Sequence, residues 1–278
     1  MALRLPPHDH EGLFSAEPPR AAWSYLRELE RRLAGADSPM GAFRAALAEG
    51  DAQLRARFEA DEPVEHLVRD RALLVDRLLL RAWELHSGAH AGELALVDVG
   101  GYGRGELLPC SDIDIMVLLP KSEAAPWTPD LERFLTFLWD IGLEVGHSVR
   151  TIDDCQREAQ SDVSVISTLI EARLLAGQEP LFVAMRRALA PDRLWSASAF
   201  FEAKVKEQRD RHHRYHDTAY NLEPNVKQSP GGLRDIQTIG WVAKRPFGAE
   251  TLDELVRHGF LTERELAECT WLVQAYGK

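Results

Sequence analysis

Residues 97–119 have the sequence VDVGGYGRGELLPCSDIDIMVLL, and this stretch decides the fold that we expect. One apolar run begins at Leu94 and ends in Gly100-Gly101, and a second extends from Ile113 to Pro120. Short apolar runs bounded by turn residues are typical of strands that are buried on both faces. The stretch therefore predicts two strands joined by a glycine-rich segment.

Helical patterns lie on both sides of these strands. Apolar residues recur near a 3.6-residue period at 64–85 and again at 130–142, and a weaker strand is expected at 143–149. We therefore expect an α/β (α+β) core with a mixed sheet at residues 89–151, preceded by helices at 21–88 and a proline-rich flexible tail at 1–20. After Thr151 the pattern is helical almost to the end, which predicts an all-helical unit at 152–278.

Composition excludes several classes of protein. The chain has 278 residues, of which 45% are hydrophobic, so it can form a sizeable core and is neither disordered nor collagen-like. Its formal charge of −11 would repel a phosphate backbone, so we expect no nucleic-acid partner. The chain has three widely spaced cysteines and no signal peptide or apolar span of about 18 residues, which indicates a cytoplasmic protein that does not enter a membrane.

Two carboxylates open the second strand. Asp112 and Asp114 are two residues apart, so they share a face with Cβ atoms about 6.6 Å apart at a rise of about 3.3 Å per residue. Paired carboxylates of this kind suit Mg²⁺, which binds through one or two carboxylates and substrate phosphates. On a strand expected to be buried, such carboxylates would be costly to desolvate unless a cation compensated for them.

The glycines that end the first strand complete the pattern. Gly100 and Gly101 lack the side chains that would keep backbone N–H groups from phosphate oxygens, which together with the carboxylates indicates nucleotide chemistry. Either feature alone is compatible with a tight turn or a capped strand end. The segment lacks the G-x-G-x-x-G spacing, and the chain has no G-x-x-x-x-G-K-[ST] motif, which excludes Rossmann and P-loop sites.

Four longer segments carry a resemblance to a known family. Gly100-Gly101 followed by Asp112-Ile113-Asp114 resembles the signature of the DNA-polymerase-β-like nucleotidyltransferase superfamily. The chain also resembles the N-terminal part of the bifunctional PII uridylyltransferase/uridylyl-removing enzymes, on the segments GGYGRGELLPCSDIDI (100–115), VGHSVRT (145–151), LIEARLLAG (169–177) and RHHRYHDTAYNLEPNVKQSPGGLRDIQTIGWVAK (211–244).

The resemblance implies a Mg²⁺-dependent transfer of UMP from UTP to a tyrosine of the PII nitrogen-signalling protein, with release of diphosphate. Asp112 and Asp114 would hold two Mg²⁺ ions, and the nucleotide would contact Gly100, Gly101, Arg104, Ser111, Asn225, Lys227 and Arg234. The loop at 221–232 would close over the nucleotide, unless it is only a solvated interdomain loop. Arg104 would either meet phosphate or pair with Glu106. Glu144 is a candidate third carboxylate, although an ordinary exposed strand position explains it better.

The same resemblance also indicates which domains of the family are missing from this chain. The HD domain that removes UMP and the ACT domains that sense glutamine have no counterpart here, so we expect a chain truncated at its C-terminal end. The alternatives are an adenylyltransferase of the same superfamily that modifies another protein, and an inactive fragment that only binds nucleotide or PII. His212, His213 and His216 are expected to be surface residues rather than metal ligands, and His147 and Trp139 to lie in the core.

Overall fold

The computed structural model describes residues 24–35, 38–121, 126–219, 225–247, 256–257, 259 and 261–268. The described residues form two compact units. The first, here called the sheet unit, comprises the described residues up to Arg157 together with Glu171–Ala188. The second, the helical unit, comprises Glu158–Ile170 and the described residues from Leu189 onward. The expected tail at 1–20 lies outside the described residues.

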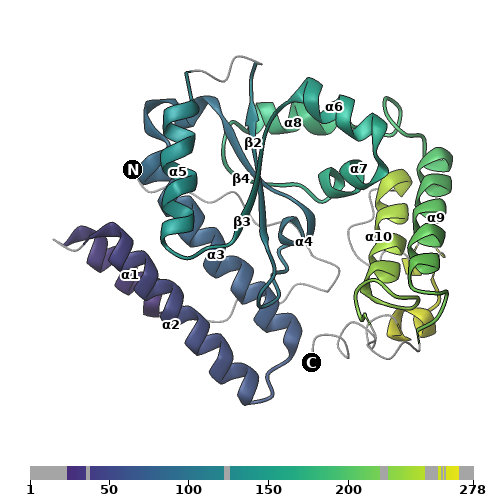
Figure 1. Ribbon diagram of the computed structural model, residues 1–278, viewed down its shortest axis with the longest axis horizontal. Helices are drawn as coiled ribbons and strands as arrows, with labels where there is room; N and C mark the ends of the chain where they lie inside the picture. Colours follow the sequence, from purple (N-terminus) through teal and green to yellow (C-terminus); the bar gives the residue numbers. More distant parts are fainter. Residues whose placement is uncertain are drawn as a thin grey trace. The chain divides into compact units, whose positions relative to one another are not determined.

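The elements follow the chain in the order shown in Figure 1. The first part contains α1 (Ser24–Ala34), α2 (Pro39–Glu59), α3 (Val64–His86), the 3₁₀ helix η1 (Gly88–Glu93), β1 (Ala95–Asp98), α4 (Gly100–Gly103) and β2 (Ile113–Leu119). Next come α5 (Thr128–Asp140), β3 (Val145–Thr151), α6 (Ile152–Ser161), α7 (Val163–Ile170), β4 (Arg173–Gly177) and α8 (Glu179–Ala188). The helices α9 (Ala197–Arg214) and α10 (Leu233–Phe247) follow.

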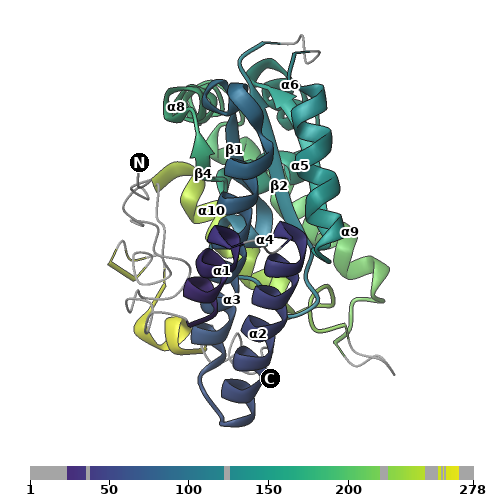
Figure 2. The same cartoon turned by 90° about the vertical axis from the view of Figure 1, so that its left-hand side faces the viewer.

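The sheet is mixed, as the sequence predicts, with strand order β3-β2-β1-β4. β2 and β3 are parallel, with Asp114 opposite Gly146, whereas β1 is antiparallel to both β2 and β4. The helices α1, α2 and α3 pack in succession, and α3 packs against α5 (Figures 1 and 2). Their apolar faces and those of β1 and β2 form one hydrophobic core, so the N-terminal helices belong to the same compact unit as the sheet.

One strand lies in the stretch that was expected to be entirely helical. β4 pairs with β1 and, with α8, returns the chain to the sheet unit, so the helical unit is interrupted in sequence by residues 171–188. The run Arg-Leu-Leu-Ala-Gly contains no β-branched residue, so its own propensity does not indicate a strand. It becomes one because the edge of β1 offers unpaired backbone groups that need partners. None of the described helices is both long and apolar enough to cross a membrane.

Candidate active site

Asp112 and Asp114 lie at the beginning of β2. Both are exposed, whereas Ile113 and Ile115 between and after them point into the core. The two carboxylates therefore lie on one accessible face, as their spacing predicts. The expectation that they are desolvated on a buried strand was wrong, because β2 is covered on both faces only from Ile115 onward.

Two glycines leave space around the carboxylate of Asp114. A Cβ atom at Gly146 in β3 would lie 2.7 Å from Oδ1 of Asp114, and one at Gly100 would lie 3.5 Å from Oδ2. The backbone N–H of Val99 donates to the Asp114 carbonyl at 3.0 Å, which fixes the start of the glycine turn beside β2. The fold thus brings Gly100, Asp114 and Gly146 together from three elements.

The glycine turn has one strained position and one crowded position. Gly100 has φ +62°, a left-handed conformation that favours glycine. A Cβ atom at Gly103 would lie 2.2 Å from the carbonyl oxygen of Glu171, so only a glycine lets α4 approach that backbone. Gly101 differs, because an added Cβ would make only an ordinary 3.5 Å contact with Arg104. The packing of this chain therefore does not by itself require glycine at 101.

Arg104 forms ion pairs with two carboxylates. Its guanidinium lies 3.1 Å from Glu106 and also contacts Glu171, and all three side chains are largely buried. Burial opposes the charge of Arg104, but Glu171 and Glu106 together raise its pKa above the ordinary value. Of the two roles considered for Arg104, the structure shows the pairing with Glu106, and it adds a partner that is 67 residues away in sequence.

Behind the glycine turn lies a buried ion cluster formed by Asp76, Asp98, Tyr102 and Arg173. Arg173 bridges the two aspartates, at 2.8 Å from Asp76, and the Tyr102 hydroxyl donates to Asp76 at 2.6 Å. Burial raises the pKa of the fully buried Asp98 to about 8, and the charge of Arg173 opposes that rise. Because Tyr102 belongs to α4 and Asp98 ends β1, the cluster holds both ends of the turn in place.

Sequence reasoning did not identify this cluster. The available signal was an aspartate, Asp98, within the apolar run 94–99, since a charge on a fully buried strand requires a partner. The identity of that partner could not be read locally, because Arg173 lies 75 residues away.

The other metal-ligand candidates are not gathered around Asp112 and Asp114. Glu144 is exposed, and its carbonyl accepts the N–H of Ile113 at 3.0 Å. Within the described ranges, no three His, Cys, Asp or Glu side chains are grouped closely enough to hold a metal ion. The expectation of a core position was wrong for His147, which is exposed, and for Trp139, which is 49% exposed and contacts His147 at a ring distance of 5.6 Å.

The loop that carries Asn225 and Lys227 belongs to the helical unit. The Asn225 side-chain oxygen accepts the backbone N–H groups of Lys227 and Gln228, at 3.1 and 2.8 Å, so Asn225 orders the loop from within. A Cβ atom at Gly232 would lie 2.7 Å from the Val226 carbonyl, which explains the glycine there. Lys227 is exposed, and the Arg234 guanidinium lies 5.3 Å from the centre of the Trp241 ring.

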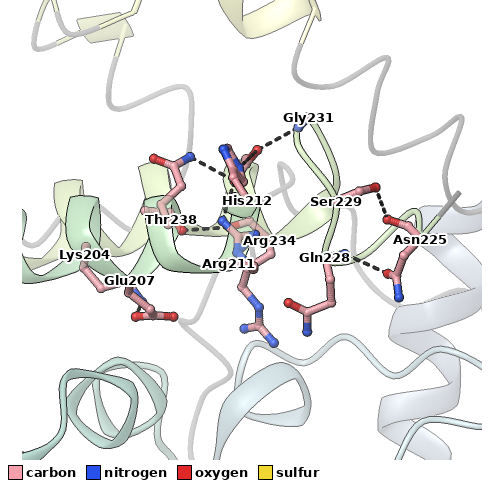
Figure 3. A network of polar contacts seen from close by, with 12 residues as sticks. Lys204, Glu207, Arg211, His212, Asn225, Gln228, Ser229, Gly231, Arg234 and Thr238 are labelled. Atoms are coloured by element: carbon pink, nitrogen blue, oxygen red, sulfur yellow. Dashed lines mark hydrogen bonds and ion pairs between the residues drawn. The ribbon is translucent and has the colours of Figure 1, made fainter. Parts of the chain in front are cut away.

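Asp235 accepts several hydrogen bonds in the polar network of this unit, in which Figure 3 labels its partners Arg211, His212 and Gly231. Its carboxylate accepts from Gln208 at 2.9 Å, from His212 at 3.0 Å and from the backbone N–H of Gly231 at 2.8 Å, and it also pairs with Arg211. Burial raises the pKa of Asp235, but these donors together lower it below its ordinary value. His212 is thus held by the Asp235 carboxylate.

The predicted site residues fall into two groups. The sheet unit contains Gly100, Gly101, Arg104, Ser111, Asp112 and Asp114, and the helical unit contains Asn225, Lys227 and Arg234. Each group is ordered by its own packing: the glycine turn by the buried ion cluster, and the loop by Asn225 and Asp235.

Comparisons with known proteins agree with this division. Residues 89–175 match the family model of the nucleotidyltransferase domain, and residues 199–274 match that of GlnD PII-uridylyltransferase. The chain is 49% identical over 229 residues to a protein of Methylococcus capsulatus named bifunctional uridylyltransferase/uridylyl-removing enzyme, covering 82% of this chain and 26% of that protein. Proteins of the same name from Pseudomonas fluorescens and Pseudomonas aeruginosa are 49% and 46% identical, covering 86% and 89% of this chain and 27% of each relative. The chain thus spans about a quarter of the length of these relatives.

Proposed function

Because this chain is homologous over more than four fifths of its length to the bifunctional uridylyltransferase/uridylyl-removing enzymes, we propose that it transfers UMP from UTP to a tyrosine of the PII signalling protein. Diphosphate is the leaving group. The observation that carries the proposal is the pair Asp112 and Asp114, exposed side by side next to a glycine turn within the matched nucleotidyltransferase domain. The match of residues 199–274 favours UTP and PII over adenylylation of another protein.

The residues at the site fit Mg²⁺. Asp112 and Asp114 offer hard carboxylate oxygens on an accessible face, and the absent side chains of Gly100 and Gly146 leave the oxygens of Asp114 approachable. Mg²⁺ commonly binds through one or two carboxylates and the phosphates of a substrate. Bound there, it would neutralise charge on the triphosphate and lower the pKa of the attacking tyrosine hydroxyl.

The protein itself contributes positioning. Gly100 turns the chain sharply beside Asp114, and without side chains at 100 and 101 the backbone N–H groups can approach phosphate oxygens. We assign to Ser111, directly before Asp112, a hydrogen bond from its hydroxyl to the same triphosphate. Because the buried ion cluster fixes the turn, these donors need little reorganisation when the substrate binds, which favours transfer.

In the helical unit, we assign the contact with the nucleotide to Lys227 and Arg234. Lys227 is exposed on an ordered loop, and Asn225 supports it by accepting two backbone N–H groups of that loop. Cations on an ordered loop suit the phosphates of a nucleotide. We also propose that the reaction takes place in the cytoplasm, because Cys110 and Cys155, the two cysteines among the described residues, are not in a disulfide.

The test is a transfer assay with purified PII, Mg²⁺ and α-labelled UTP or ATP. We expect label from UTP on PII, and a loss of more than about 100-fold in Asp112→Asn and Asp114→Asn, because each removes a charged ligand oxygen. Glu132→Gln removes an exposed carboxylate on α5 and serves as the matched control with unchanged transfer. Label from ATP alone would favour the adenylyltransferase, and no label from either nucleotide would favour an inactive fragment.

A further inference from the structure

The helical unit buries a cluster of cations that the proposed function does not yet use. Lys204 and Arg211 lie on α9 with side chains only 1% and 3% exposed. Arg234 joins them from α10, because it lies over the same Trp241 ring as Lys204, whose Nζ is 4.3 Å from the ring centre. Figure 3 shows these side chains in one network with Glu207.

The carboxylates of this network are already engaged. Glu207 pairs with Lys204 at 2.5 Å, and Asp235 accepts from Gln208, His212 and Gly231 in addition to one nitrogen of Arg211. Burial lowers the pKa of Lys204, Glu207 raises it, and the positive charges of Arg234 and Arg211 lower it further. Lys204 and Arg211 are therefore two like charges that lie close enough to affect one another in a buried place.

Arg211 shows where such an anion would bind. Its Nε and Nη1 are buried and have no hydrogen-bond acceptor among the residues that the structure describes, and the same holds for Nε1 of Trp241. Buried donors without acceptors are rare in folded proteins, because each has lost the hydrogen bonds that it would make with water. Guanidinium groups are the preferred partners of phosphate oxygens.

We infer that Arg211, together with Lys204 and Arg234, forms a phosphate receptor inside the helical unit. The chemistry selects an oxyanion with several acceptor oxygens, since one oxygen cannot accept from both Nε and Nη1 of Arg211. This inference rests on the proposed function in one respect, which is that the bound phosphate would belong to the triphosphate of the nucleotide. Free polyphosphate has the same chemistry and is the alternative source of the bound phosphate.

The experiment titrates inorganic tripolyphosphate into the full chain by calorimetry, in EDTA so that the Asp112 and Asp114 site takes no part. We expect saturable binding that is weakened about 10- to 100-fold in Arg211→Gln, as for the loss of a hydrogen bond to a charged group. Arg209→Gln makes the same change at an exposed position of α9 and is expected to bind within twofold of the wild type. Equal affinities in the two variants, or no binding by the wild type, would overturn the receptor.

A second titration with UTP in EDTA distinguishes the two sources. The same loss in Arg211→Gln supports the nucleotide as carrier, whereas a loss for tripolyphosphate alone contradicts it. UMP transfer is not measured in either titration. A chain that binds tripolyphosphate through Arg211 but modifies no PII would therefore contradict only the proposed function.

Loss of Arg211 also removes a partner of Asp235, so a spectroscopic measurement on the wild type keeps the inference testable if Arg211→Gln does not fold. With ¹⁵N-labelled arginine, the Nε–H resonance of Arg211 is assigned by its absence in Arg211→Lys. We expect that resonance to shift when tripolyphosphate is added. An unshifted resonance at saturating tripolyphosphate would refute the assignment.

Discussion

Gly146→Ala tests whether the position of Asp114 controls the reaction. Gly146 lies opposite Asp114 in the parallel pair of β3 and β2, and a Cβ atom there would lie 2.7 Å from Oδ1 of Asp114. Carbon and oxygen atoms in ordinary contact are at least about 3.4 Å apart, so the carboxylate must move by about 0.7 Å. The carboxylate is the end of an exposed side chain, so it can move without disturbing the backbone.

The expected effect is on catalysis rather than on folding. A displacement of about 1 Å at a reacting centre costs about 100-fold in rate, so about 0.7 Å predicts a 10- to 100-fold lower kcat, or about 1.4–2.7 kcal/mol. Stability is expected to be unchanged or higher, because alanine is favoured over glycine within a strand by about 0.5–1 kcal/mol.

The assay is steady-state transfer of UMP to PII over a series of Mg²⁺ concentrations, with a thermal melt of the same samples. Gly41→Ala in α2 is the matched control, because a Cβ atom there would meet nothing within 4 Å. It should raise the melting temperature and leave kcat unchanged. A kcat within twofold of the wild type for Gly146→Ala would refute the assigned role of Asp114, and a large drop in melting temperature would show that the clash is not confined to the carboxylate.

Three further predictions concern stability. Gly103→Ala places a Cβ 2.2 Å from the Glu171 carbonyl, so urea unfolding should show a loss of about 1–3 kcal/mol. Arg173→Met removes the guanidinium that pairs with Asp76 and Asp98 in the buried ion cluster, which predicts a loss of about 3–5 kcal/mol at pH 7. That loss should grow as the pH rises through about 8, the pKa of Asp98, because only the ionised carboxylate is stabilised by the charge of Arg173, and a pH-independent loss would contradict the cluster's role. Asp154 accepts the backbone N–H and hydroxyl of Thr151, which hold its pKa at about 2, and Asp154→Ala should cost about 1 kcal/mol at pH 7. Because a lowered pKa stabilises the fold only above the unfolded value, this difference should disappear as the pH falls from about 4 to 2, and a difference that persists at pH 2 would contradict the capping role.

Much of the sheet unit could be predicted because its signals are local. The apolar runs that become β1 and β2, the periodic helices α3 and α5, and the carboxylates on one face of β2 each depend on residues within about one turn or strand of each other. Periodicity reports the side of an element that is buried, but it does not identify the element packed against that side. This is why β4 was assigned to a helical stretch, although it completes the sheet.

By itself, then, the sequence determined the first two strands, the glycine turn between them and the pair Asp112 and Asp114, since spacing alone places both carboxylates on one face. Only the tertiary structure decided which residues surround them. Arg173 meets Asp76 across 97 positions, and Gly146 faces Asp114 because parallel strands bring their starts together. In the helical unit, Asp235 on α10 collects donors from a loop and from α9. Such contacts depend on how elements pack, and a buried charge shows that it needs a partner without showing which residue provides it.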